Sequence, residues 1–197
     1  MIEKTLEKEL NIKSWQVNKV IQLIDKGNTI PFIARYRKDI TGGLDDEILR
    51  KFDTRLKYLR NLEHKKEQII EKIKNLGKLT NELKEKILSA ETLVELDDLY
   101  LPYKSKKRTK ATIAREKGLE SLANTILEQN LAEPVENIAK KYINPELDVN
   151  TEQEAIEGSK DIIAEIISEN ADFRKKIREN TLYHGFIETK VKKDSEN

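Results

Sequence analysis

The side chains that most often carry catalysis are sparse in this sequence. Its only histidines are His64 and His184, and it contains no cysteine. Nucleophilic catalysis needs a serine, threonine or cysteine beside a positioned base, usually histidine. His64 has only Glu67 within helical reach, and one histidine with one carboxylate falls short of a metal site. His184 lies at an expected helix end, where a positive imidazole favours the helix dipole. We therefore expect no catalytic centre, no metal site and no cofactor, so that the protein is not an enzyme.

Two other short motifs could in principle bind ions. In the carboxylate run at residues 95–98, Asp97 and Asp98 would project about 100° apart on a helix. We expect one of them to face solvent and the other to pair with a nearby basic loop. The Gly42-Gly43 pair precedes a helix as in phosphate-binding loops, but the acidic residues 45–47 would repel an anion there.

Positive charge gathers between residues 104 and 117, which hold seven basic residues and one acid. Lysines and arginines on a loop can neutralise phosphates, and a tyrosine can stack on a base. The alternative is that a lysine-rich loop only adds solubility. An acidic block at residues 121–172 has twelve acids and could neutralise the loop on folding. The candidate nucleic-acid contacts in this region are Tyr103, Lys104, Lys106, Lys107, Arg108, Lys110 and Arg115.

The elements near the N-terminus outline a helix-turn-helix. Ser14 is a plausible N-cap for an amphipathic helix that Gly27 closes, and Pro31 suits the first turn of a short second helix. Most such pairs only pack against each other, but some contact DNA. On the second reading, the candidate contacts are Arg35, Tyr36 and Arg37.

A long helix is predicted after this element. Asp45 is its expected N-cap, with Leu44 and Leu49 as a hydrophobic staple, and an apolar stripe runs to Leu76 before Gly77. At 1.5 Å per residue the helix would span roughly 45–50 Å. Its polar middle, residues 63–68, is the pattern expected where a helix crosses water between two packed regions.

Start signals predict further helices after residue 77, and only residues 186–191 show a strand-like alternation. Two of these helices begin at Thr80 and Thr92, and a third begins at Pro134. Two short helices are expected near residues 113–117 and 119–129. The last two are expected at residues 152–169 and 172–182. The predicted fold is all-α, an irregular array of helices around one long central helix. The predicted parts are residues 1–43 with the helix-turn-helix-like element, 44–77 with the long helix, 78–185 with the basic loop 103–110, and a charged tail at 186–197.

Two ordered motifs resemble the N-terminal hallmarks of the Tex family of transcription accessory proteins. The first is Asn28-Thr29-Ile30-Pro31-Phe32-Ile33-Ala34-Arg35-Tyr36-Arg37-Lys38, with Thr41-Gly42-Gly43-Leu44-Asp45 after it. The second runs from Leu96 to Glu120 through Leu99-Tyr100-Leu101-Pro102-Tyr103-Lys104 and Lys106-Lys107-Arg108-Thr109-Lys110-Ala111. Glu157-Gly158 and the helix to Glu169 also fit, so the resemblance covers nearly the whole chain. The departures are Asp97 in place of glutamate, and Ser105 and Ser121 in place of proline, which loosen the loop without removing charge.

The resemblance implies a longer cytoplasmic protein with an RNase-H-like domain, helix-hairpin-helix segments and a C-terminal oligonucleotide-binding barrel. We therefore expect this chain to be a fragment that binds RNA or DNA weakly without those domains. It also implies contacts with the transcription machinery and with the remaining domains of the full-length chain. In this family the helix-turn-helix element is completed by a later segment, so Arg35 and Arg37 could instead pair with Asp39, Asp45 or Asp46.

Composition limits the remaining possibilities. The 37 basic and 36 acidic residues give a net charge of +1, so no global field attracts nucleic acid or a membrane and any binding must be local. No signal segment or apolar run of membrane-spanning length is present, which favours a cytoplasmic protein with no membrane partner. The expected function is a non-catalytic scaffold that contributes to nucleic-acid binding in transcription. The alternative is a protein-protein interaction scaffold with no direct nucleic-acid contact.

Overall fold

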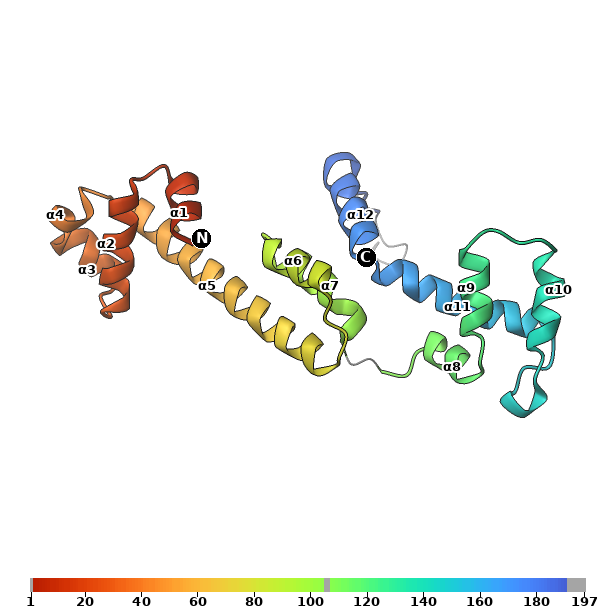
Figure 1. Ribbon diagram of the computed structural model, residues 1–197. Coiled ribbons are helices and arrows are strands. Elements are labelled where there is room, and N and C mark those ends of the chain that lie inside the picture. The colour runs from red at the N-terminus through yellow and green to blue at the C-terminus, as the bar shows by residue number, and fades with distance from the viewer. Residues whose placement is uncertain (1, 105–106, 191–197) are drawn as a thin grey trace, which may run out of the picture. The chain divides into compact units, whose positions relative to one another are not determined.

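Helices make up the regular structure of this chain. A computed structural model describes residues 2–104 and 107–190 (Figure 1). Within these residues it contains α-helices and short 3-10 turns, and its only strand-like pairing is an isolated bridge between Asn144 and Val149. The predicted all-α fold is therefore confirmed. The described part of the 186–191 segment, which showed strand-like alternation, contains no strand.

The chain divides into two compact units, Met1–Thr92 and Leu93–Asn197. The first unit contains α1 (Ile2–Leu10), α2 (Ser14–Asp25), α3 (Ile30–Tyr36), α4 (Lys38–Thr41), α5 (Asp46–Asn75) and α6 (Asn81–Ser89). The second unit contains α7 (Leu93–Tyr100), α8 (Lys110–Glu116), α9 (Glu120–Leu127), α10 (Val135–Ala139), α11 (Glu152–Glu169) and α12 (Ala171–His184). Its 3-10 turns are Leu101–Tyr103, Lys140–Tyr142 and Pro145–Leu147.

Helix α5 is the long helix that the sequence predicts. The Asp45 side chain accepts a hydrogen bond from the Ile48 N–H at 2.8 Å, which confirms it as the N-cap. Its 30 residues span about 45 Å. Leu44 and Leu49 are both buried in the same core, as a hydrophobic staple requires.

The first core forms where α1, α2 and α3 pack around the N-terminal half of α5. Its fully buried side chains include Leu6, Val17, Ile33, Phe52 and Leu56. Helix α1 was not predicted, although Ile2, Leu6 and Leu10 follow each other at four-residue steps. Charged residues fill the positions between them, and the helix is stabilised by packing against α5.

The polar middle of α5 is not the water-crossing segment that the sequence suggested. Lys66 is only 2% exposed and continues the buried stripe between Leu62 and Ile69. Its ammonium group contacts Glu63 Oε1 at 3.0 Å and donates to the Leu88 carbonyl of α6 at 2.9 Å. A long lysine stem can cover apolar surface while its charge reaches polar partners, so a lysine takes the place of a leucine here.

The second core lies where α8, α9 and α10 pack against α11. Thr151 caps α11, and its buried face includes Ala155, Ile156 and Ile162. Gly158 allows close packing, because a Cβ at this position would come within 2.4 Å of Leu119 Cδ1. After α7, Leu101–Tyr103 form a 3-10 turn that leads into the basic loop.

Candidate nucleic-acid interface

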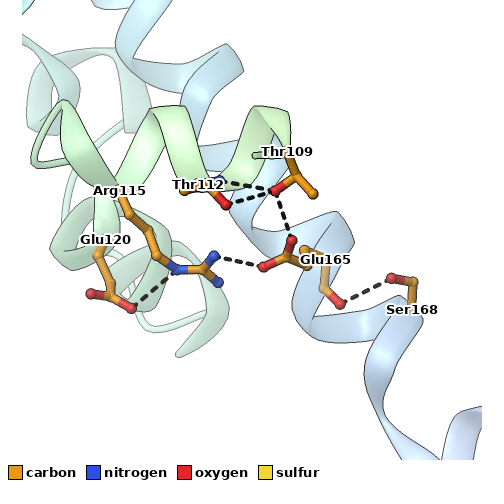
Figure 2. A network of polar contacts seen from close by, with 6 residues as sticks. All are labelled: Thr109, Thr112, Arg115, Glu120, Glu165 and Ser168. Carbon is orange, nitrogen blue, oxygen red and sulfur yellow. Dashed lines mark hydrogen bonds and ion pairs between the residues drawn. The ribbon is translucent and has the colours of Figure 1, made fainter. Parts of the chain in front are cut away.

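The basic loop at residues 103–110 is anchored at its C-terminal end by a polar network. Thr109 is the N-cap of α8, and its hydroxyl accepts from the Thr112 N–H at 3.1 Å. The same hydroxyl donates to Glu165 Oε2 of α11 at 3.0 Å, as Figure 2 shows. The end of the loop is therefore fixed to the longest helix of the second unit.

Arg115 belongs to this network. Its Nη1 donates to Glu165 Oε1 at 2.6 Å, and its Nε lies 3.4 Å from Glu120 Oε1 (Figure 2). The hydrogen bond that Arg115 donates to the Glu165 carboxylate is the main reason that the pKa of Arg115 is raised. Two carboxylates therefore neutralise Arg115, which places it in the framework of the loop.

The other cations of the loop fall into two groups. Arg108 pairs with Glu116 at 2.7 Å. Lys104, Lys107 and Lys110 are exposed, and the structure shows no ion pair for them within the residues it describes. Lys106, also predicted as a contact, lies outside the described residues. The loop thus presents lysine charges, while Arg108 in the loop and Arg115 in α8 are paired.

Tyr103 is half-buried at the end of the 3-10 turn that follows α7. Its partial exposure is compatible with stacking on a base, as is that of Tyr100. Both tyrosines belong to the second unit, together with the lysines.

The candidate residues of the first unit lie at the end of α3. Tyr36 is 59% exposed, and its ring lies 5.3 Å from that of Phe32. The Arg37 guanidinium lies over the Phe32 ring at 4.9 Å and donates to the Tyr36 carbonyl at 3.0 Å. Arg35 is exposed. The end of α3 therefore presents an aromatic and basic surface.

Two of the three acids proposed as alternative partners for these arginines are used otherwise. Asp45 caps α5, and Asp46 pairs with Arg50 at 2.6 Å. Among the described residues, no ion pair links Arg35 or Arg37 to Asp39, Asp45 or Asp46. The cation-π contact of Arg37 leaves its charge near the surface.

Within the carboxylate run at residues 95–98, Asp98 binds α12. Asp98 is 4% exposed and accepts from Arg174 and Arg178 of α12, each at 2.6 Å, instead of pairing with the basic loop. Asp97 is exposed. Burial alone would raise the pKa of Asp98, but the hydrogen bonds and charges of the two arginines outweigh it and lower that pKa. The run therefore serves to attach α12.

Sequence reasoning did not find Glu165, Arg174 or Arg178 as partners. Glu165 is one of twelve acids in its block, and no local pattern distinguishes it from the others. Its importance follows only from the packing of α8 on α11, which brings residues 50 and more positions apart into contact.

The two histidines lie on helices, His64 within α5 and His184 at the end of α12. His64 Nε2 lies 2.8 Å from Gln68 Nε2 one turn along α5, and His184 is the last residue of α12. Across residues 2–104 and 107–190, no group of three or more potential metal ligands comes together. In the same ranges, no helix has both the length and the apolar character needed to cross a membrane.

Over the residues that the structure describes, the fold and the loop define an all-helical protein with lysines exposed beside a partly buried ionic network. The family profiles described as the Tex-like protein N-terminal domain and as Tex central region-like match residues 1–74 and 130–197. The chain is 47% identical to Protein tex of Bordetella pertussis over 94% of its length, and 41% identical to Transcriptional accessory protein Tex of Neisseria gonorrhoeae over 96%. It is also 36% identical over 86% of its length to a human protein named S1 RNA-binding domain-containing protein 1.

The chain belongs to the Tex family of transcription accessory proteins. It spans 23% and 25% of the length of the two bacterial relatives and 17% of the human one.

Proposed function

We propose that this chain is a helical scaffold of a cytoplasmic Tex-type transcription accessory protein and contributes phosphate contacts of its own. The observation that carries the proposal is that the arginines at the basic loop are paired with carboxylates, whereas its lysines are exposed. Arg108 and Arg115 are held by carboxylates, whereas Lys104, Lys107 and Lys110 are exposed. Flexible ammonium groups on an anchored loop suit the backbone of RNA or DNA.

The family supports a link to nucleic acid and to transcription. One relative is named as a transcriptional accessory protein, and another is named for an RNA-binding domain. The end of α3, with Arg35, Tyr36 and Arg37, is a second candidate contact through its helix-turn-helix-like setting. On this proposal the chain holds the other parts of a longer protein and acts without catalysis.

Fluorescence anisotropy with single- and double-stranded oligonucleotides at several salt concentrations tests the role of the loop. The variant Lys104→Ala, Lys107→Ala, Lys110→Ala should weaken binding and flatten the salt dependence. Loss of three phosphate contacts changes the slope of log K against log salt by about 2.7 for duplex DNA and about 2.1 for single strands.

The matched control removes three exposed lysines elsewhere, with Lys74→Ala, Lys78→Ala and Lys84→Ala. These residues also show no ion pair within the described part of the chain. If both variants lower affinity equally, binding reflects overall charge and the loop has no particular role. If the unaltered chain binds neither RNA nor DNA, the alternative of a protein-interaction scaffold replaces the proposal.

A further inference from the structure

A groove opens on the first unit between α1, α5 and the end of α6. Its volume of about 650 Å³ falls within the range of roughly 300–1,000 Å³ that ligand sites occupy. The residues of α5 that line it run from Arg55 to Lys66, which corresponds to roughly 16 Å along the axis. The groove is therefore long enough for about three turns of a helix.

The floor of the groove is apolar. Leu59 and Leu62 of α5 are buried beneath it, and Leu88 of α6 remains 44% exposed at its edge. Ile2 and Ala90 complete the apolar lining. This arrangement suits apolar side chains that recur every three or four residues on a partner helix.

The charges around the groove leave a positive surplus. Arg55 and Glu9 form a two-pronged ion pair, with distances of 2.6 and 2.7 Å. Lys4 and Lys8 lie one turn apart on α1 and line the groove, and neither has an ion pair within the described residues. The remaining acids, Glu63 and Glu91, are already engaged.

Lys66 adds a buried donor to the same groove. Its ammonium group bonds Glu63 and the Leu88 carbonyl, which uses two of its three N–H groups. Because Lys66 lines the groove, the third N–H can donate to an acceptor that enters it.

We propose that this groove is the docking site for an acidic amphipathic helix of a partner protein. Apolar side chains of that helix pack on Leu59, Leu62 and Leu88, and its flanking carboxylates pair with Lys4 and Lys8. The site goes beyond the proposed function, because it lies on the first unit and uses none of the residues of the basic loop.

Four synthetic labelled helical peptides test the proposal in a two-by-two design. Their apolar stripe is either leucine or serine, and their flanks are either glutamate or lysine. In anisotropy titrations with the whole chain, only the leucine-glutamate peptide should bind. The variant Lys4→Glu, Lys8→Glu should lower its affinity about tenfold or more, and Leu88→Asp should do the same.

The matched control is Lys19→Glu, Lys26→Glu, which reverses two exposed charges outside the groove, one on α2 and one at its C-cap. It should leave peptide affinity unchanged, and circular dichroism should show that every variant is folded. The proposal is overturned if no peptide binds, or if the Lys4 and Lys8 reversals have no more effect than the control. It is also overturned if single-stranded oligonucleotides displace the peptide. A dimer in sedimentation velocity that Leu88→Asp converts to a monomer would show that a second copy occupies the groove, which likewise rejects it.

Discussion

Asp98 Oδ1 accepts a hydrogen bond from Arg174 Nε at 2.6 Å, which joins α7 to α12 across 76 positions of the chain. Arg178 binds the other carboxylate oxygen at the same distance. Helix α12 buries none of its side chains, whereas Asp98 is almost fully enclosed. The attachment of α12 to α7 therefore depends on charge rather than on an apolar face.

Replacing the Asp98 carboxylate should loosen α12. Asp98→Asn removes the charge that both arginines share, and hydrogen bonds to charged groups contribute about 1.5–3 kcal/mol. Because Arg174 and Arg178 keep 42% and 40% of their side chains exposed, we expect a loss at the lower end of that range. Urea unfolding measures the loss, and hydrogen exchange should show faster exchange in α12. Glu179→Gln, a charge change on α12 itself, should change neither.

The contact of Asp98 with Arg174 and Arg178 also predicts that the free energy of unfolding depends on pH. The pKa of Asp98 is lower in the folded chain than the value of about 3.9 expected when unfolded. A lowered pKa contributes stability above the unfolded value, and that stability is lost as pH falls through the folded value. The stability difference between the wild type and Asp98→Asn should be constant above about pH 5 and shrink below about pH 4. Urea titrations at a series of pH values measure it, and a difference that grows on acidification would contradict the assignment.

The buried stem of Lys66 should be worth as much as an apolar side chain. Lys66→Ala removes three buried methylene groups at about 0.8 kcal/mol each, so we expect the free energy of unfolding to fall by about 2 kcal/mol. It also leaves the Leu88 carbonyl without its ammonium donor. Lys74→Ala, at an exposed position of the same helix, should stay within about 0.5 kcal/mol of the wild type. Equal stability of the two variants would show that the middle of α5 is solvated after all.

Gly158 should resist a substitution that usually strengthens helices. Alanine is favoured over glycine in a helix interior by about 1 kcal/mol. Here the added Cβ would meet Leu119 Cδ1 at 2.4 Å, so Gly158→Ala should destabilise the second unit by about 1–3 kcal/mol. In a Leu119→Ala background the obstructing methyl groups are gone, and the same change should become neutral or stabilising. Thermal unfolding of the wild type, Gly158→Ala, Leu119→Ala and the double variant measures the coupling between the two positions. Additive effects of the two substitutions on stability would reject the predicted contact.

Local signals predicted most of the helices because they act over a few residues. The side chains of the N-cap residues Asp45, Thr80 and Thr151 accept hydrogen bonds from N–H groups three residues later. Such a short separation can be recognised from the sequence alone. Helix α11 also has the predicted bounds of 152–169. Helix α1 was missed because its narrow apolar stripe is stabilised mainly by packing on α5.

The candidate interface was predictable only in part. The concentration of cations at residues 104–117 is a property of composition, and the sequence displays it directly. Which of these cations are paired depends on distant partners, such as Glu165 for Arg115 and Glu116 for Arg108. Residues 103–110 therefore remain predicted contacts, now with the exposed lysines as the leading candidates.

The sequence by itself determined the all-α class, the family, the long helix and the absence of a cysteine. Helix propensity, capping and ordered motifs all lie within short stretches of chain, so they need no knowledge of the fold. Only the tertiary structure decided the partners of the charged side chains. Lys66 lies in the buried stripe of α5, Asp98 binds arginines of α12, and Arg115 binds Glu165 of α11. A long charged side chain can pair with any of several opposite charges. The packing of helices that are distant in the sequence determines which of these charges lies close enough.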